Sequence, residues 1–263
     1  MPNVLEVSRL SFTYPSAAAP TLGEVSFVVG SHEFVCVVGP SGSGKTTLLN
    51  CLAGLTRPTG GGVLLEDQEL TGPSPRVGVV FQDYSRSLFP WLTAAKNVAF
   101  PLTTRGLSKA EVASRVELAL ESVGLGGHGA KYPWEMSGGM QQRVAIARAL
   151  AVQPHLLIMD EPMASVDAQT RSDLEDLVLR IWAERQISVV LVTHDIDEAI
   201  YMSDRVVVLS TPPAAVHNVI CVDLPRPREQ LATKEDPAFG HLRARLFAEI
   251  SELRRSSAPE LTQ

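Results

Sequence analysis

The chain has 263 residues, of which 45% are hydrophobic and 20% charged, and its formal net charge is −6. This length and composition suffice for a hydrophobic core and predict one large domain, or one domain with a subdomain. The acidic balance gives no electrostatic footprint for duplex nucleic acid, so we expect no nucleic-acid partner, although a local basic patch is compatible with it.

Several absent sequence signals bear on where the chain works. The N-terminus has no basic region followed by an apolar core, so no signal peptide is expected. No apolar run approaches the ~18 residues that a membrane-spanning helix needs. The cysteines, Cys36, Cys51 and Cys221, form no C-x-x-C pair; Cys36 and Cys51 are interpreted as small buried hydrophobes. The sequence therefore predicts a soluble, cytosolic protein whose membrane role, if any, comes through a partner.

The first third of the chain predicts strands around a glycine-rich loop. Residues 4–10, 25–29 and 33–38 have strand patterns, and Tyr14 lies in the connection between the first two. The loop from Gly39 to Thr47 reads Gly-Pro-Ser-Gly-Ser-Gly-Lys-Thr-Thr and fits the pattern G-x-x-x-x-G-K-[ST]. A helix over 47–55, ended by Gly54, follows it. Strand, glycine loop and helix in this order are the setting of a phosphate-binding P-loop.

The P-loop pattern assigns a role to each part of the loop. Glycines let the backbone approach a phosphate, and a helix start offers unpaired N–H groups and a positive dipole end. Lys45 is expected to reach the β- and γ-phosphates of ATP, and the Thr46 hydroxyl to hold Mg²⁺. The alternative is a Gly/Ser turn with a surface lysine. The expected nucleotide-binding residues are Gly39, Pro40, Ser41, Gly42, Ser43, Gly44, Lys45, Thr46 and Thr47.

The middle of the chain changes character. Strands are predicted at 63–65 and 77–81, the second ending at Gln82. The stretch 88–92 is aromatic and broken by proline, unlike a core strand. A capping box, Ser108 with Glu111, starts a helix that runs to about residue 123, and another helix is expected over 140–151. Residues of about 85–150 are therefore predicted to form a mainly helical insertion.

Strand and helix alternate again after Pro154. Strands are predicted at 155–159, 187–193, 206–209 and, at a sheet edge, 216–222. Helices are predicted at 168–184, capped by Asp167, and at 195–202. The run Leu224-Pro-Arg-Pro-Arg228 breaks the pattern. A final helix over 237–254 presents an apolar side, and the last eight residues are expected to be frayed.

Polar residues stand where several of these strands end. Besides Gly39, they are Gln82, Asp160 with Glu161, and His194. Each of three also has an interpretation without a catalytic role. Gln82 could be a surface residue, Asp160 could cap a turn, and His194 could be a buried histidine with satisfied hydrogen bonds. Ligands of open α/β sheets bind beyond the carboxyl ends of the strands, so the set together indicates a catalytic site.

Hydrolysis of a γ-phosphate requires charge neutralisation and an oriented water. Asp160 is expected to hold Mg²⁺, and Glu161 to polarise the attacking water. His194 is expected to contact the γ-phosphate and to hold the water and Glu161 in place. Gln82 would complete the shell of Mg²⁺ and water. The predicted catalytic residues are therefore Glu161, His194, Gln82 and Lys45, and the predicted metal ligands Thr46, Gln82 and Asp160.

A second strong motif, Met136-Ser-Gly-Gly-Met-Gln-Gln-Arg143, places Ser137, Gly138 and Gly139 at a helix start, which is a ready-made anion site. The alternative is an ordinary serine cap with two glycines. With this motif the chain resembles an ATP-binding cassette ATPase, the nucleotide-binding subunit of an ABC transporter. The resemblance covers roughly residues 4–230 and rests on the P-loop, Gln82, the Ser-Gly-Gly signature, Leu-Leu-Ile-Met-Asp-Glu-Pro, Asp167 and His194, in family order.

The resemblance implies a fold and a set of partners. The fold is α/β, a RecA-like P-loop NTPase core sheet with an antiparallel β region and an inserted α-helical subdomain. Tyr14 would stack on adenine. Two subunits would close head to tail as an ATP-bound homodimer, with Ser137 to Gly139 meeting the partner's γ-phosphate and Asp167 in the loop that crosses the interface. The insertion would contact a membrane-spanning permease subunit. Met136 and Ala164-Ser165-Val166 depart from the usual family residues but keep similar size and polarity.

Finer placement rests on two stretches. Residues 81–93 and 224–228 resemble the importer branch that takes up nitrate, taurine, alkanesulfonates and bicarbonate. The resemblance implies an ATPase domain over 1–230, with the helical subdomain at about 85–150, and a C-terminal helical tail over 231–263. It implies a peripheral position at the cytoplasmic face of the membrane, and an indirect partnership with a substrate-binding protein.

Other interpretations are a soluble cassette protein acting on nucleic acid or ribosomes, and a small-molecule kinase. The first class usually shows two cassettes, a long coiled-coil insertion or basic arms. The second has no need of the Ser-Gly-Gly signature, or of Glu161 paired with His194. Co-purification with membrane subunits, with nucleic acid or with neither would separate these interpretations.

Overall fold

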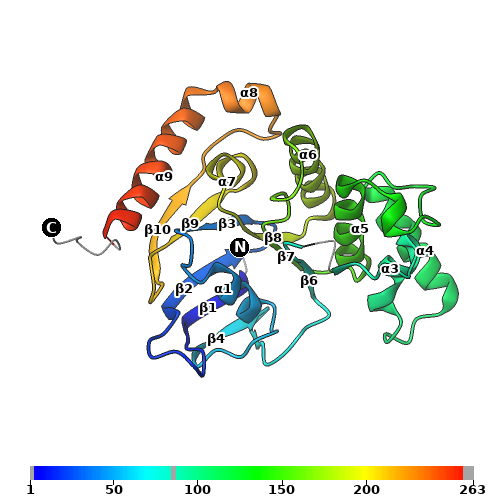
Figure 1. Cartoon of the computed structure of the whole chain (residues 1–263), viewed down its shortest axis with the longest axis horizontal. Coiled ribbons are helices and arrows are strands. Elements are labelled where there is room, and N and C mark those ends of the chain that lie inside the picture. The colour runs from blue at the N-terminus through cyan, green and yellow to red at the C-terminus, as the bar shows by residue number, and fades with distance from the viewer. Residues whose placement is uncertain (1–2, 84–86, 257–263) are drawn as a thin grey trace. The chain divides into compact units, whose positions relative to one another are not determined.

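The computed structural model, drawn in Figure 1, describes residues 3–83 and 87–256. The chain divides into two compact units. Unit 1 comprises residues 1–74 and 188–263, and unit 2 comprises residues 75–187. Part of the predicted frayed end, 257–263, and residues 84–86 of the importer-like stretch lie outside the described residues. Each unit is described by itself below.

Unit 1 contains the predicted antiparallel β region. Its strands lie in the order β2 (Leu22–Gly30), β1 (Asn3–Phe12), β4 (Gly60–Leu65) and β5 (Gln68–Glu69). Strand β1 pairs antiparallel with both β2 and β4. Leu5 and Val7 are buried because alternate residues of a strand face the same side of the sheet. Leu10 is buried out of that phase, beyond a shift of register between Val7 and Leu10.

A second set of strands in unit 1 carries the P-loop. Strand β3 (Phe34–Val38) lies between β8 (Ser188–Val192) and β9 (Arg205–Leu209), and all three run parallel. Strand β10 (Val216–Cys221) lies at the sheet edge, as predicted, and pairs antiparallel with β9. All residues of β3 and β8 are buried. Parallel strands covered on both faces require such continuous apolar runs, which explains why these strands show no alternation.

The helices of unit 1 are α1 (Lys45–Leu52), α7 (Ile196–Met202), α8 (Gln230–Glu235) and α9 (Pro237–Ser256). Helix α9 packs beside α7 (Figure 1). The apolar side predicted for the final helix consists of Leu242, Leu246, Ile250 and Leu253; of these, Leu246 and Ile250 are buried, together with Phe239. The C-terminal helix is therefore packed on the rest of its unit, whereas its exposed Phe247 points away from the core.

Unit 2 combines two parallel strands with a group of helices. Strand β6 (Val77–Val80) pairs with β7 (Leu156–Asp160). Helices α3 (Ala94–Ala99), α4 (Lys109–Ser122) and α5 (Gly138–Ala151) pack against one another, and α6 (Ala168–Arg185) follows β7. Short 3₁₀ turns occupy η1 (Phe100–Leu102) and η2 (Pro133–Glu135). The capping box at Ser108 and the cap at Asp167 are both confirmed.

Two helices, α3 and α8, were not predicted, and two others start earlier than predicted. Helices α3 and α8 have six residues each, too short for a periodic pattern. Helix α1 begins at Lys45 and α5 at Gly138, two residues before the predicted starts. Glycine and β-branched residues have low helix propensity, so a helix that begins among them is masked in the sequence.

Two of the three cysteines were predicted to be buried, and both are. Cys36 and Cys51 are buried, and Cys221 is exposed. Burial raises the pKa of the Cys51 thiol to about 11, and that of Cys36 well above its ordinary value. Both thiols therefore stay protonated at neutral pH and act as small apolar groups. Among the described helices, none has the length and apolarity to cross a membrane.

Candidate active site

The glycine loop of unit 1 folds around the end of a lysine side chain. Helix α1 begins at Lys45, and its N-cap, Gly44, has a φ of 82°. The Lys45 ammonium donates hydrogen bonds to the carbonyl oxygens of Gly39 and Pro40, each at 3.0 Å. Lys45 is only 9% exposed, so its cation lies across the loop instead of reaching into solvent. The alternative of a surface lysine is therefore wrong.

The same loop fits the phosphates of a nucleotide. A side chain at Gly44 would place Cβ 2.9 Å from Leu22 Cδ2 and Thr21 Cγ2, so glycine is required there by space and by φ. Because the N-cap of α1 is glycine, no capping side chain accepts hydrogen bonds from the first N–H groups of the helix. The Ser43 hydroxyl is fully buried and has no hydrogen-bond partner among the described residues. Cation, helix start and buried hydroxyl together suit an anion.

Tyr14, predicted to stack on adenine, lies beside this loop. Its hydroxyl is 2.9 Å from Thr47 Oγ1, and either oxygen can donate. Tyr14 is 46% exposed, and its ring packs edge-on with Phe12 at a centroid distance of 4.8 Å. The structure therefore brings Tyr14 to the P-loop with much of its ring accessible, as a base-stacking residue requires.

His194 also lies at the P-loop. The N–H of Thr193, just past β8, donates to the carbonyl of Val37 in β3 at 3.2 Å, so the two strand ends run side by side. His194 and Gly39 line one cavity of about 720 Å³. His194 is exposed, so the alternative of a buried structural histidine is wrong. Unit 1 thus assembles Tyr14, the P-loop and His194.

Unit 2 brings together the two other strand-end groups. Gln82 Nε2 donates to Glu161 Oε2 at 3.0 Å, although the residues are far apart in sequence. Asp160 ends β7 and is buried, whereas Gln82 is exposed. Glu161 has a φ of 42°, a left-handed conformation that costs an ordinary residue about 1–3 kcal/mol. The backbone turns sharply after Asp160, which explains how adjacent carboxylates come to occupy different environments.

The signature serine caps its helix as predicted. Ser137 Oγ accepts from the N–H of Met140 at 3.3 Å at the start of α5, and Ser137 is exposed. A Cβ at Gly139 would lie 2.6 Å from Thr170 Cγ2 in α6, so this glycine is required by a close helix approach. Asp167 accepts from the N–H and hydroxyl of Thr170 at 3.0 and 2.7 Å. Hydrogen bonds from the Thr170 backbone and then its side chain lower the pKa of Asp167.

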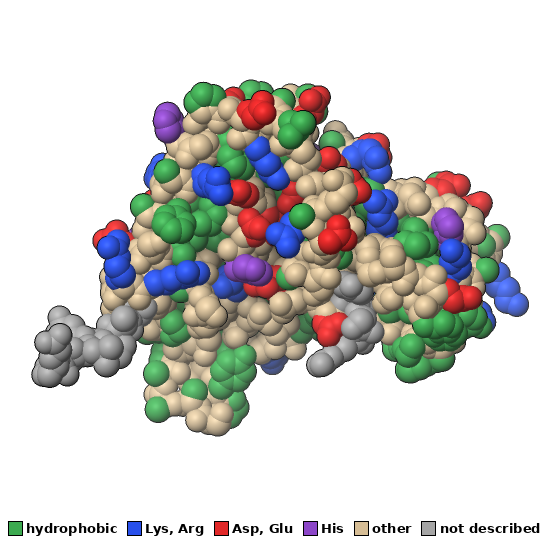
Figure 2. All heavy atoms as spheres, turned by 45° about the horizontal axis from the view of Figure 1, so that its top comes forward, with side chains coloured by type: hydrophobic (Ala, Val, Ile, Leu, Met, Phe, Trp, Pro, Cys, Tyr) green, Lys and Arg blue, Asp and Glu red, His purple; other side chains and the backbone are tan. Residues whose placement is uncertain are grey.

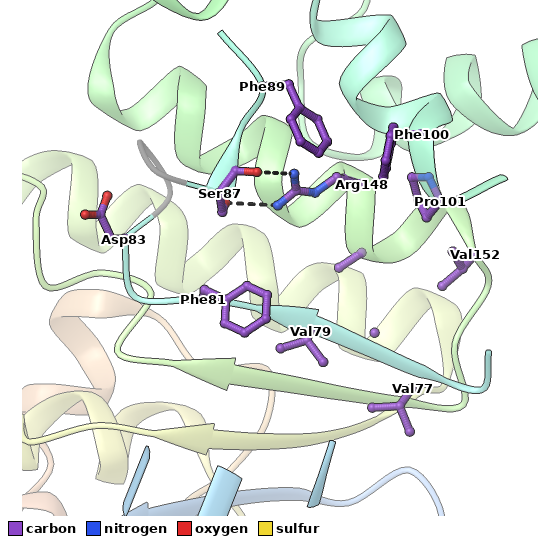
Figure 3. Close-up of a pocket in the computed structure, with 12 residues that line it drawn as sticks. Val77, Val79, Phe81, Asp83, Ser87, Phe89, Phe100, Pro101, Arg148 and Val152 are labelled. Atoms are coloured by element: carbon purple, nitrogen blue, oxygen red, sulfur yellow. Dashed lines mark hydrogen bonds between the residues drawn. The ribbon is translucent and has the colours of Figure 1, made fainter. Parts of the chain in front are cut away.

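An apolar cavity of about 510 Å³ lies beside the Gln82 loop (Figure 3). The rings of Phe81, Phe89 and Phe100 surround it, with valines on the β6 side. Arg148 reaches from α5 to the carbonyl oxygen and hydroxyl of Ser87, at 2.5 and 2.9 Å. Burial lowers the pKa of Arg148. The Arg148 side chain forms one wall of the cavity. Its hydrogen bonds fix Ser87, the first described residue after 84–86.

The aromatic loop at 88–92 is held by a residue that the sequence reading missed. Asn97 is fully buried; its amide accepts from the N–H of Phe89 at 2.8 Å and donates to the carbonyls of Phe89, Leu92 and Thr93. Trp91 remains 69% exposed on the loop so held. Asparagine within a predicted insertion carries no distinctive spacing, so only the structure shows this role.

Figure 2 shows acidic and basic side chains intermixed over the face in view. The formal charge of −6 is therefore distributed among charges of both signs, instead of forming a single acidic face there.

Comparisons with known proteins agree with the geometry. The family described as ABC transporter matches residues 22–164. An uncharacterized ABC transporter ATP-binding protein of Methanocaldococcus jannaschii is 47% identical over 231 residues, 86% of this chain and 85% of that protein. Nitrate transport protein NasD of Klebsiella oxytoca is 40% identical, covering 98% of this chain and all of NasD. The dimeric post-hydrolysis structure of the ATP-binding cassette MJ0796, bound to ADP and Pi, has a TM-score of 0.72 and 31% identity, covering 83% of this chain and 98% of that one.

These matches establish that the RecA-like α/β fold with its antiparallel β region was correctly predicted, as was ATP hydrolysis coupled to transport. The chain belongs to the ABC transporter family, as an ATP-hydrolysing subunit.

Proposed function

We propose that this chain powers an importer of a small anionic solute, such as nitrate, a sulfonate, taurine or bicarbonate, through separate membrane subunits. The observation that carries the ATPase part is the Lys45 cation, held across the glycine loop at the start of α1. The likeness to the nitrate transport protein over almost the whole of both chains supports the solute class.

ATP would bind through the loop Gly39 to Thr47, with Lys45 on the β- and γ-phosphates and Tyr14 stacked on adenine. The exposed Thr46 hydroxyl, the Asp160 carboxylate and the Gln82 side chain would hold Mg²⁺. Hydroxyl, carboxylate and amide oxygens are the donors that this cation prefers. When bound, Mg²⁺ neutralises charge on the β- and γ-phosphate oxygens.

Glu161 would act as the general base toward the attacking water. The hydrogen bond from Gln82 limits the orientations of its carboxylate. His194 would donate to the γ-phosphate and help to hold the water. Because Glu161 stands in a left-handed conformation, its side chain leaves the strand in a direction that a regular β residue cannot take.

Transport would require two further contacts. In the ATP-bound homodimer, Ser137, Gly138 and Gly139 of one subunit would meet the γ-phosphate held by its partner, with Asp167 in the crossing loop. The membrane-spanning subunits would dock at the apolar cavity beside the exposed Trp91. Such a contact places the chain peripherally at the cytoplasmic face of the membrane, with a substrate-binding protein as an indirect partner.

The test combines a purified protein with a transport assay. Lys45→Ala is expected to abolish Mg²⁺-dependent ATP hydrolysis, because the β- and γ-phosphates lose their cation. Lys109→Ala, at the exposed start of α4, is the matched control and should keep the parental rate. Undiminished hydrolysis by Lys45→Ala would end the P-loop interpretation.

Uptake of labelled nitrate, taurine and bicarbonate, measured in cells that lack the gene and then carry either variant, tests the solute class. Restoration of uptake of one of these anions by Lys109→Ala, but not by Lys45→Ala, supports the proposal. If none of them depends on the gene, the assigned class of solute is wrong even where ATP hydrolysis is intact.

A further inference from the structure

The stretch Leu224–Arg228 has no role in the chemistry above, yet its last arginine is built into the end of a helix. Arg228 is only 8% exposed. Its Nη1 donates to the carbonyl oxygens of Ile200, Tyr201 and Ser203, at 3.1, 2.8 and 2.7 Å. Carbonyls at a helix end have no partner within the helix, and a cation there is stabilised by the dipole. Arg228 therefore fixes the C-terminal end of α7.

The other arginine of this stretch ties the same end of α7 to strand β3. Arg226 Nη2 donates to Asp204 Oδ1 at 2.7 Å and to the carbonyl of Met202 at 3.0 Å. The second oxygen of Asp204 accepts from the N–H of Phe34 at 2.9 Å. Phe34 begins β3, and that strand leads directly into Gly39 of the P-loop. The two arginines thus connect the elements that carry the P-loop and His194.

The opposite end of α7 carries His194. The N–H of Asp195, the N-cap of α7, donates to Thr193 Oγ1 at 3.0 Å. The Thr193 hydroxyl also bonds the carboxylate of Glu198, one turn into the helix, and both residues are buried. His194 stands between these anchored neighbours. Because α7 has seven residues, a rise of about 1.5 Å per residue makes it about 10 Å long. A displacement of the C-terminal end of α7 is therefore expected to displace His194 by a similar amount.

We propose that Arg228, supported by Arg226, is a positioning residue for ATP hydrolysis: by fixing the end of α7 it sets His194 against the P-loop. The inference rests on the proposed role of His194. It differs from a purely stabilising role, because a stabilising contact would change melting without acting through the histidine.

A double-mutant cycle in purified protein separates the two roles. Arg228→Gln is expected to lower kcat roughly 10- to 100-fold, the effect of misplacing a catalytic group by about an ångström. KM for ATP should stay within about twofold, because the phosphate loop itself is unchanged. Arg228→Lys keeps the cation and should recover part of the loss. In a His194→Ala background, Arg228→Gln should cost less than about a further twofold, because the group it positions is gone.

Arg205→Gln is the matched control. Arg205 is also half-buried, on β9 of the same unit, and pairs with Glu33. Its substitution should change kcat by the same small factor in both backgrounds. If Arg228→Gln does not fold, the cycle is run with Arg228→Lys and Arg226→Lys, at temperatures below their measured Tm.

Two results are decisive against the inference. If His194→Ala lowers kcat and Arg228→Gln costs the same factor with and without the histidine, Arg228 does not act through His194, and the positioning role falls alone. If His194→Ala itself leaves kcat unchanged, the proposed role of His194 fails, and the positioning role fails with it. Single-turnover hydrolysis of labelled ATP keeps the slow variants measurable.

Discussion

Tyr14 combines two interactions that substitution can separate. Its hydroxyl lies 2.9 Å from Thr47 Oγ1, and the residue is exposed. Stacking of a base on an aromatic side chain contributes about 1–3 kcal/mol. Tyr14→Ala is therefore expected to weaken ATP binding roughly 5- to 150-fold with little change in kcat at saturation, whereas Tyr14→Phe keeps the ring and should lose much less. Equilibrium titration with a fluorescent ATP analogue measures both.

If Tyr14→Phe weakens ATP binding as much as Tyr14→Ala does, the effect comes from the hydroxyl that bonds Thr47 and not from the ring. Binding as tight as in the parent chain for Tyr14→Ala would mean that the adenine lies elsewhere. A kcat measurement at saturating ATP provides the internal control, because a stacking residue contacts the base and not the reacting phosphate.

At the level of single residues, the sequence predicts which residues belong to the candidate site better than it predicts their backbone conformation and contacts. The glycine loop, Asp160 and the Ser137 cap follow from local patterns, because each pattern states a requirement of the backbone. The left-handed φ of Glu161 and the four-way hydrogen bonding of Asn97 do not. Both arise from neighbours distant in sequence or from a turn that the strand pattern does not encode, and Gln82 pairs with Glu161 for the same reason.

At the level of elements, strands and long helices follow from periodicity, and short helices do not. Strands β3, β7 and β8 were predicted because continuous apolar runs of about this length suit strands buried on both faces. The six-residue helices α3 and α8 escaped prediction, since tertiary packing and not local pattern stabilises so short a helix. The role of Arg228 was hidden for another reason: the end of α7 was predicted, but the contacts of Arg228 with it join residues at least 25 positions apart in sequence.

The aromatic loop before α3 offers a test at this level. Trp91 is 69% exposed, tilted against Phe89 at a centroid distance of 5.5 Å, on a loop fixed by Asn97. Exposed apolar groups beside an apolar cavity are typical of a partner surface. Trp91→Ala is therefore expected to spare intrinsic ATP hydrolysis and to lower solute uptake, or hydrolysis stimulated by the membrane subunits, by at least about fivefold, roughly 1 kcal/mol of interface energy.

Leu118→Ala is the control for Trp91→Ala, because Leu118 is an exposed apolar residue on α4 in the same unit. It should leave both hydrolysis and uptake near the parental level. Thermal melting distinguishes a core role: a large fall in Tm for Trp91→Ala, with membrane subunits still bound, would show that the tryptophan supports the fold and not the partner.

At the level of the whole molecule, the candidate catalytic residues are divided between the two units. Unit 1 carries the P-loop, Tyr14 and His194, and unit 2 carries Gln82, Asp160, Glu161 and the Ser137 signature. The dimeric structures among the relatives show that such cassettes pair. Length and composition alone could not predict this division, because both are totals for the whole chain and do not say where a compact unit begins or ends.

Glu161→Gln tests whether hydrolysis and dimer closure are separable. The amide keeps the shape of the side chain but removes the charge that polarises the attacking water, and a well-placed acid/base residue contributes roughly 10²–10⁴ in rate. ATP binding should survive, because the phosphate contacts belong to Gly39–Thr46. Loss of the carboxylate also relieves repulsion against the γ-phosphate. The variant is therefore expected to bind ATP, turn over very slowly, and elute as a dimer in ATP but as a monomer in ADP.

Adding Ser137→Arg to Glu161→Gln tests which surface closes on the nucleotide. Ser137 is the exposed cap of α5, so the protein should still fold with an arginine at this position. The large side chain should block the partner's γ-phosphate from the helix start. The double variant should still bind ATP as a monomer and should no longer dimerise on size-exclusion chromatography. A double variant that dimerises in ATP would show that the signature does not meet the partner's nucleotide. Full turnover by Glu161→Gln alone would show that another residue polarises the attacking water. The Glu161 carboxylate accepts a hydrogen bond from Gln82, so the variant Gln82→Ala would then show whether this pair contributes to the rate at all.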